Sequence, residues 1–241
     1  MIFKLKSICK TFALNNRLKI MQPLMRQDCV LCNATSGRHM LCPACYAGLP
    51  RSANACPQCA AASNGEICGA CLAHPPAYDR AHAALDYRFP VDKLIQTLKY
   101  GHQLALAHLL GELSAVALRR LPRPDRILPM PLHPARMRER GFNQAHEIAK
   151  VIAKKLALTL DPTLATRIVN TPPQATLALG ARLKNVKGAF ACRHDVKNLH
   201  IALVDDVMTS GATLNELAKT LKQAGAREIS VWVVARAVAH R

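Results

Sequence analysis

The stretch that decides the fold is Ile201-Ala-Leu-Val-Asp-Asp-Val-Met-Thr-Ser-Gly-Ala-Thr213. Its first four residues are all apolar, which is typical of a strand buried on both faces of a parallel sheet. After this stretch, apolar residues from Leu214 to Leu221 follow the spacing of a helix, and Gly225 is a residue that ends one. The pattern therefore predicts a strand, a loop and a helix in an α/β fold.

The loop of this stretch has the composition of a phosphate site. Its residues are Thr209, Ser210, Gly211, Ala212 and Thr213. Backbone N–H groups and the positive end of the helix dipole meet there, and a glycine allows close approach of a ligand. The two acids before the loop, Asp205 and Asp206, suit ribose hydroxyls or a Mg²⁺ ion bound to the phosphates of a substrate. The alternative is a pair of acids that only caps the helix.

This string closely resembles the phosphoribosyl pyrophosphate signature of type I phosphoribosyltransferases. The resemblance implies a central parallel sheet flanked by helices. It also implies that Asp205 and Asp206 hold the ribose and that residues 209–213 hold the 5′-phosphate. Purine-salvage members carry an acid where this chain has Thr209, so the resemblance does not extend to a 6-oxopurine acceptor.

The charge of the chain favours anionic partners. Its 241 residues suffice for one core of ordinary size plus a small appendage, and 33 Lys and Arg against 15 Asp and Glu give a net charge of +18. Such an excess attracts nucleotides, nucleic acid or an anionic membrane, and it also favours solubility. We find no window with the roughly 18 apolar residues of a membrane helix. Residues 1–27 lack the features of a signal peptide, so we expect a cytoplasmic protein. Because Met21 and Met25 lie just before the first cysteine pair, we expect translation to begin there and the leader to be dispensable.

Eight of the ten cysteines form four C-x-x-C pairs. Two thiolates three positions apart can bind one ion across a tight turn, and two such pairs complete a tetrahedral Zn²⁺ site. The short spacers favour sequential pairing, while alternating pairing stays open. The favoured sets are Cys29, Cys32, Cys42 and Cys45 for one structural ion, and Cys56, Cys59, Cys68 and Cys71 for the other. We expect a double zinc ribbon over residues 28–76, in a reducing compartment.

A second informative run is Ile127-Leu-Pro-Met-Pro-Leu-His-Pro-Ala-Arg-Met-Arg-Glu-Arg-Gly-Phe-Asn-Gln144. It predicts a short strand followed by a loop rich in Pro and Arg, and then a helix over residues 145–158. Loops at the carboxyl ends of parallel strands bind ligands, and arginine binds phosphate readily. The alternative for the arginines is a solvated surface.

This second run resembles the signature of the ComF family, bacterial proteins associated with DNA uptake and with use of external DNA. The segment Leu98-Lys-Tyr100 and the cysteine pairs agree with it. A further ComF-like pattern consists of Arg167, Thr171, Gln174, Leu177, Arg182, Asn185, Val186, Gly188, Ala189 and Phe190. The resemblance covers about residues 28–235 and implies a phosphoribosyltransferase-like domain over residues 77–241.

The resemblance also implies roles by position. The pyrophosphate loop is expected to use Arg136, Arg140, Asn143 and Gln144. A flexible hood over the site is expected to use Gln174, Arg182 and Lys184. Competence-system proteins are the partners that the family suggests.

Two functions are compatible with these patterns. The first is a phosphoribosyltransferase that takes phosphoribosyl pyrophosphate with Mg²⁺, works by positioning and electrostatics, and has an open acceptor and no assigned nucleophile. The alternative is a non-catalytic protein that binds single-stranded DNA through the basic surface and the zinc ribbons. The low count of ten Phe, Tyr and Trp leaves few residues for base stacking.

Overall fold

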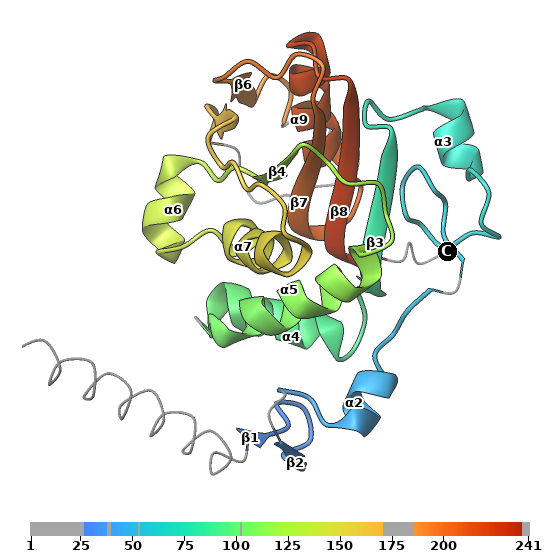
Figure 1. Ribbon diagram of the computed structural model, residues 1–241, viewed down its shortest axis with the longest axis vertical. Coiled ribbons are helices and arrows are strands. Elements are labelled where there is room, and N and C mark those ends of the chain that lie inside the picture. The colour runs from blue at the N-terminus through green and yellow to red at the C-terminus, as the bar shows by residue number, and fades with distance from the viewer. Residues whose placement is uncertain (1–26, 38–39, 53, 102, 171–185, 238–241) are drawn as a thin grey trace, which may run out of the picture. The chain divides into compact units, whose positions relative to one another are not determined.

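The computed structural model describes residues 27–237 apart from short gaps. The residues outside the description are 1–26, 38–39, 53, 102, 171–185 and 238–241 (Figure 1). The predicted leader therefore lies outside the described residues except for Gln27. The chain divides into two compact units between Leu49 and Pro50.

The first unit is built from short elements. β1 (Gln27–Asp28) pairs antiparallel with β2 (Thr35–Gly37), and Gln27 lies opposite Gly37. α2 (Pro43–Ala47) follows, with Pro43 in its first turn, where the missing N–H of proline costs no hydrogen bond. These elements carry the first two C-x-x-C pairs.

The second unit is organised around a four-stranded sheet in the order β3-β8-β7-β4. All three strand pairs are parallel. The strands are β3 (Arg80–Asp86), β4 (Arg126–Pro129), β7 (His200–Met208) and β8 (Glu228–Arg236). The four apolar residues from Ile201 to Val204 are each 0% exposed, as expected for a strand covered on both faces. The carboxyl ends of all four strands therefore lie along one edge of the sheet.

Helices cover both faces of this sheet (Figure 1). α5 (Ala105–Leu118) packs on β3 and β8, and α7 (Gln144–Leu156) packs on β4, on β7 and on α5. α4 (Val91–Tyr100) packs on α5. α9 (Ala212–Gln223) contacts β8 and β6, and its Leu214 and Leu217 share a core with Ile201. The α/β fold with a helix-flanked parallel sheet that the sequence predicted is confirmed.

Two details of the second unit differ from the sequence-based expectations. Residues predicted as a loop contain α6 (Pro134–Arg140), which His133 caps at its start and Gly141, with φ 78°, ends. The helix predicted to begin at residue 145 begins at Gln144. The remaining elements are α3 (Gly69–Ala73) and the antiparallel pair of β5 (Ala165–Arg167) and β6 (Phe190–Cys192).

The second half of the predicted 28–76 module belongs to this unit. Cys56, Cys59 and Cys71 are buried in the same core as Tyr78 and Ile229. The boundary between the compact units thus lies between the two cysteine sets, not after both of them.

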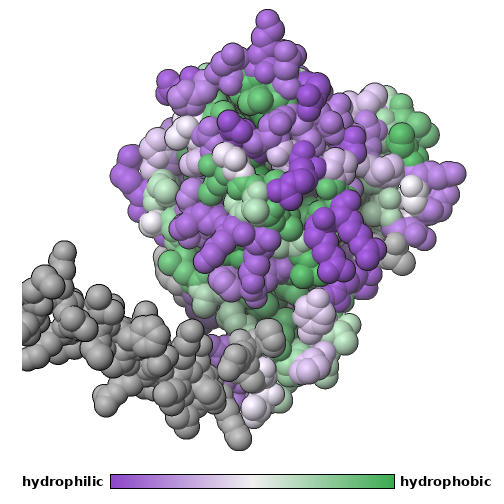
Figure 2. Space-filling view, viewed as in Figure 1, coloured by the Kyte–Doolittle hydropathy of each residue, from purple (hydrophilic) through white to green (hydrophobic). Residues whose placement is uncertain are grey.

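The surface of the second unit is mixed. Figure 2 shows hydrophilic residues over much of the viewed face, interrupted by hydrophobic areas. Large apolar side chains that are exposed include Phe89 at 76% and Tyr100 at 72%. None of the helices in the described part of the chain is long and apolar enough to cross a membrane.

Candidate functional site

The two acids of the deciding stretch lie near the carboxyl end of β7, next to β8, where Asp205 is in register with Val233. Successive residues of a strand start on opposite faces, but these two side chains lie close enough for each to shift the pKa of the other. The Asp205 carboxylate turns back to accept a hydrogen bond from the Asp206 N–H at 2.9 Å. The Asp206 side chain is 4% exposed.

Lys99 is the partner of Asp206. Its Nζ lies 2.5 Å from Asp206 Oδ2, and its side chain is 21% exposed. Burial opposes ionisation of Asp206, but the Lys99 ammonium holds the pKa of this carboxyl below its usual value. The carboxylate in turn outweighs burial and raises the pKa of Lys99. A buried ion pair therefore lies at the carboxyl edge of the sheet.

The pKa of Asp205 is shifted in the opposite direction from that of Asp206. Burial raises its pKa well above the usual value, and the neighbouring Asp206 charge raises it further. Lys99 lowers this pKa without cancelling the rise. A bound cation would favour the ionised form of Asp205.

The loop between β4 and α7 brings arginines to the same edge. Arg140 Nη1 donates to Gln144 Oε1 at 2.6 Å, and its guanidinium lies 5.8 Å from the ring centroid of Tyr100, the residue after Lys99. The charge of Arg140 lowers the pKa of Lys99, against the larger effect of Asp206. Two segments that lie far apart in the sequence therefore meet beside Asp206.

Asn143 and Arg136 have other partners in the structure. Asn143 Oδ1 accepts from the N–H groups of Ala145 at 3.0 Å and His146 at 3.3 Å, and Asn143 Nδ2 donates to the carbonyl of Met130 at 3.0 Å. Asn143 thus caps α7 and ties it to the end of β4. Arg136 pairs with Glu139 at 2.8 Å on α6.

Arg167 is a further cation of this region. It ends β5, and its guanidinium lies 5.6 Å from the ring centroid of Phe190 on β6. Burial lowers the pKa of Arg167, while the Asp205 charge raises it and the Arg136 charge lowers it. Arg167 is therefore electrostatically coupled to both Asp205 and Arg136.

The predicted phosphate loop leads from β7 into α9. Gly211 precedes the helix with φ 76°, and a Cβ there would lie 2.8 Å from Met208 Cε and 3.3 Å from the Tyr78 hydroxyl. Only glycine fits this position without strain. Ser210 Oγ accepts from the Ala212 N–H at 3.3 Å, and the first turn of α9 carries no acid. The helix start therefore keeps its positive electrostatic potential.

Sequence reasoning assigned roles to some of these residues and missed others. It assigned the acids, the loop and the arginines of 136–140. It placed Lys99 and Arg167 within family patterns and gave neither a role. The available signal for Lys99 was a lysine in the last turn of an amphipathic helix, which is common and not specific. The predicted hood residues Gln174, Arg182 and Lys184 lie outside the described residues.

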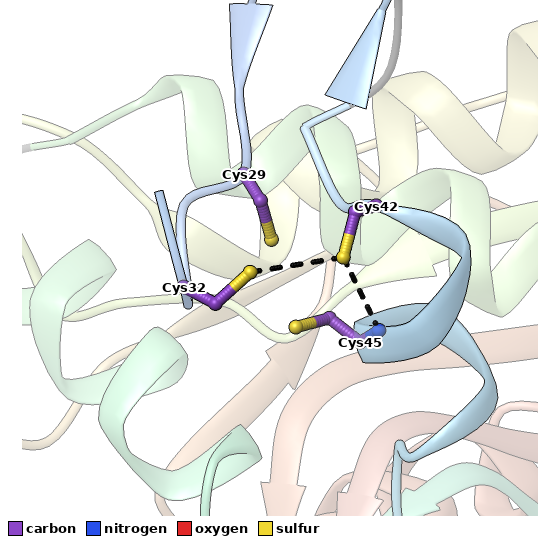
Figure 3. Close-up of side chains that lie close together, drawn as sticks. All are labelled: Cys29, Cys32, Cys42 and Cys45. Carbon is purple, nitrogen blue, oxygen red and sulfur yellow. Dashed lines mark hydrogen bonds between the residues drawn. The ribbon is translucent and has the colours of Figure 1, made fainter. Parts of the chain in front are cut away.

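The cysteines form two groups, one in each unit. The first consists of Cys29, Cys32, Cys42 and Cys45 (Figure 3), and the second of Cys56, Cys59, Cys68 and Cys71. Within each group the sulfur atoms all lie within 4.8 Å of one another. These are the sets that sequential pairing favoured.

The geometry of both groups fits a tetrahedral metal ion. Sulfurs bonded to zinc at about 2.3 Å are about 3.8 Å apart in a tetrahedron. The distance from Cys32 Sγ to Cys42 Sγ is 3.7 Å, and that from Cys59 Sγ to Cys68 Sγ is also 3.7 Å. Backbone N–H groups point at sulfur in both, from Cys45 to Cys42 Sγ at 3.4 Å and from Cys68 to Cys56 Sγ at 3.3 Å.

The ionisation of the thiols also requires a cation. In the first group burial acts against ionisation of Cys29, yet backbone N–H donors led by Cys42 lower its pKa to about 6. Cys32 and Cys42 raise the pKa of Cys45 to about 12. Four thiolates cannot coexist at this spacing unless a positive ion neutralises them. Both clusters are therefore consistent with zinc sites.

The sequence of this chain is similar to those of known proteins. Residues 143–241 match the family described as "Phosphoribosyl transferase domain". "DNA utilization protein YhgH" of Salmonella typhi is 35% identical over 204 residues, which are 81% of this chain and 90% of that protein. "Competence protein F" of Haemophilus influenzae is 32% identical over 222 residues, which are 87% of this chain and 96% of that protein.

Among solved structures, the purine phosphoribosyltransferase from Pyrococcus horikoshii Ot3 aligns with 53% of this chain and 70% of its own, at 18% identity and a TM-score of 0.34. The two relatives match over most of their own length at more than 30% identity. The chain therefore belongs to the ComF/YhgH family, which combines a phosphoribosyltransferase domain with two cysteine clusters.

Proposed function

We propose that this protein binds phosphoribosyl pyrophosphate at the carboxyl end of β7 and acts as a phosphoribosyltransferase. The observation that carries the proposal is the meeting of two acids, the start of α9 and several cations along one edge of the sheet. An ion pair of 2.5 Å links Lys99 on α4 to Asp206 on β7. The guanidinium of Arg140 lies 5.8 Å from the ring centroid of Tyr100, the next residue on α4. Phosphoribosyl pyrophosphate has a sugar diol between a phosphate and a pyrophosphate. These groups match the acids, the start of α9 and the cations at this edge.

Each part of the ligand has a chemical counterpart. The N–H groups and hydroxyls of residues 209–213 suit the 5′-phosphate, because a helix start attracts an anion. Asp205 and Asp206 suit the ribose hydroxyls. Lys99, Arg136 and Arg140 suit the pyrophosphate, which arginine can bind through two parallel hydrogen bonds.

Mg²⁺ fits this assignment at Asp205. Burial and the Asp206 charge raise the pKa of Asp205, so a bound cation would favour the ionised carboxylate, whose oxygens are ligands that Mg²⁺ prefers. A bound Mg²⁺ would neutralise charge on the substrate's phosphates. Asp206 already has a cation of its own in Lys99.

The chain's own residues would promote transfer by positioning and electrostatics. The loop and the acids hold the sugar at both ends, and the carboxylates face the positive charge that develops at the anomeric carbon. Lys99 and Arg140 offset the negative charge of the departing pyrophosphate. No nucleophile is needed, and Thr209 in place of an acid argues for an acceptor other than a 6-oxopurine. Gln174, Arg182 and Lys184 remain the proposed hood.

We infer that both cysteine clusters hold structural Zn²⁺. Four thiolates complete a tetrahedron and leave no open position for a substrate or a water. Zinc thus supplies folding free energy in short segments that carry few large apolar side chains.

A second candidate function is binding of single-stranded DNA, which the names of the relatives suggest. Tyr100 favours it, because this ring is 72% exposed and carries the Arg140 guanidinium 5.8 Å from its centroid. An exposed ring beside a cation can stack a base and contact its phosphate. Competence-system proteins are candidate partners of such a complex, and the cytoplasm is its expected location.

Calorimetric titration with phosphoribosyl pyrophosphate, with and without Mg²⁺, tests the first candidate. Wild type should bind, and Asp205→Asn with Asp206→Asn should abolish binding. Pyrophosphate release, screened with nucleobases, amines and DNA as acceptors, then tests turnover. For the second candidate, Tyr100→Ala should weaken binding of a single-stranded oligonucleotide, with a steep dependence on salt. No binding of phosphoribosyl pyrophosphate by wild type ends the first proposal.

A further inference from the structure

Arg236, the last residue of β8, connects the second cysteine cluster to the proposed phosphate loop. Its Nε donates to the backbone carbonyl of Cys59 at 2.9 Å. Its Nη1 donates to the carbonyl of Met208 at 2.9 Å and also to the carbonyl of Thr209. Met208 ends β7 and Thr209 begins the loop. One guanidinium thus joins a cluster residue to the base of the loop.

The segment after the cluster touches the same loop. Tyr78 is 3% exposed and shares a core with the cluster cysteines. Its hydroxyl lies 3.3 Å from the place where a Cβ on Gly211 would be. The Ala77 N–H donates to Asn215 Oδ1, in the first turn of α9, at 2.7 Å. Residues next to the second cluster therefore contact both the loop and the first turn of α9.

We propose that Arg236 is a positioning residue of the phosphate loop and that the second cysteine cluster, with its metal, anchors Arg236. The inference rests on the proposed phosphate site. The planar guanidinium of arginine has five N–H donors and can bind several carbonyls at once. The ammonium of lysine cannot do so in the same geometry. A loop already held in its binding conformation loses less entropy when it binds an anion. Loss of metal from the second cluster then loosens the loop and weakens binding.

The proposal assigns no anchoring role to the first cluster. Its cysteines belong to the other compact unit. Arg236 donates instead to carbonyls of the second unit, namely those of Cys59, Met208, Thr209 and Ala237. Loss of metal from the first cluster should therefore leave the loop unchanged.

Two variants of Arg236 test the positioning role. Arg236→Met keeps the apolar stem and removes every donor, while Arg236→Lys keeps the charge. Arg227→Met is the matched control, because Arg227 precedes the other end of β8 and pairs with Asp125 at 3.6 Å on the surface. The readouts are amide hydrogen exchange of residues 208–215, zinc content, and the Kd for phosphoribosyl pyrophosphate. We expect faster exchange and a Kd about tenfold weaker for Arg236→Met, the scale of one lost hydrogen bond to a charged group. Arg236→Lys should recover part of this, and zinc content should stay at two ions.

Two cysteine variants test the anchoring role. Cys68→Ser and Cys45→Ser each remove one partly buried ligand, from the second and the first cluster respectively. Each should lose one zinc, but only Cys68→Ser should speed exchange in residues 208–215. If Cys68→Ser does not fold, chelator titration of Cys45→Ser, which should keep zinc in the second cluster alone, followed by the same exchange measurement, decides the question.

The outcomes separate the inference from the proposed function. If wild type fails to bind phosphoribosyl pyrophosphate, the proposed function fails, and the exchange data still judge the role of Arg236. If wild type binds and Arg236→Met matches it in both Kd and exchange, the inference is overturned. Equal loop exchange in the two cysteine variants would overturn the role of the second cluster.

Discussion

Replacement of Lys99 by methionine is the most informative perturbation of the site. Lys99 Nζ lies 2.5 Å from Asp206 Oδ2, and the two side chains are 21% and 4% exposed. Removing one partner of a buried pair leaves an uncompensated charge, which typically costs about 3–5 kcal/mol. We expect Lys99→Met to lose free energy of unfolding on this scale at pH 7, because methionine keeps the apolar stem and only the charge disappears.

The sign of the pH dependence is set by the direction of the pKa shift. In wild type Lys99 lowers the pKa of Asp206, so this pair stabilises the fold above the unfolded pKa of the acid, and the stabilisation is lost as pH falls through the lowered folded pKa. In Lys99→Met, burial without the cation raises the pKa of Asp206 above its unfolded value. The variant should therefore regain stability as the pH falls and Asp206 takes up a proton.

Urea unfolding at pH 7 and pH 5 measures both effects. Lys93→Met, an exposed lysine on the same helix, is the control and should match wild type. The double variant Lys99→Met with Asp206→Asn removes both charges and should be more stable than Lys99→Met alone. A Lys99→Met protein as stable as wild type, or a double variant no better than the single one, would refute the reasoning.

Three further predictions concern the acid pair, the loop and the metal clusters. Because burial and Asp206 raise the pKa of Asp205, binding of phosphoribosyl pyrophosphate with Mg²⁺ should strengthen as pH rises through that raised pKa, and calorimetry on Asp205→Asn should show a flat pH profile. Gly211→Ala should cost about 1–2 kcal/mol in urea unfolding from its φ of 76° and should also weaken phosphate binding, since the new Cβ would lie 2.8 Å from Met208 Cε. Gly65→Ala, at φ 98° with nothing within 4 Å, shares the backbone strain without the crowding and should leave binding unchanged. A zinc chelator should remove about two ions per chain, expose eight reactive thiols and lower the melting temperature, whereas retention of full thermal stability without zinc would contradict a structural role.

The sequence was most informative where its signal is local. The apolar run before Asp205 specifies a strand, and the small residues and helical spacing after Asp206 specify the loop and α9. The C-x-x-C spacing places two thiolates on one side of a tight turn, so each pair depends on neighbouring residues alone. The sulfur distance of 3.7 Å in both clusters agrees with sets chosen by spacer length.

The sequence was least informative where a contact joins distant segments. The bond from Arg236 to the Cys59 carbonyl spans 177 positions. Lys99 reaches Asp206 from a helix that periodicity predicted well, yet nothing in that pattern distinguishes Lys99 from Lys93. The run rich in Pro and Arg after β4 was predicted as a loop, although Pro134 in the first turn of α6 is compatible with a helix.

The sequence by itself determined the α/β fold and the acids and loop at the end of β7, and it favoured the two cysteine sets that the structure brings together. It could do so because periodicity and short spacings act between residues close along the chain. Only the tertiary structure decided that Lys99 neutralises Asp206, that the charge of Asp205 acts on Arg167, and that cysteines of the second cluster share a core with Met208, the residue before the proposed phosphate loop. Parallel strands bring their carboxyl ends to one edge whatever their order in the chain, so the partners at that edge are set by the strand order β3-β8-β7-β4.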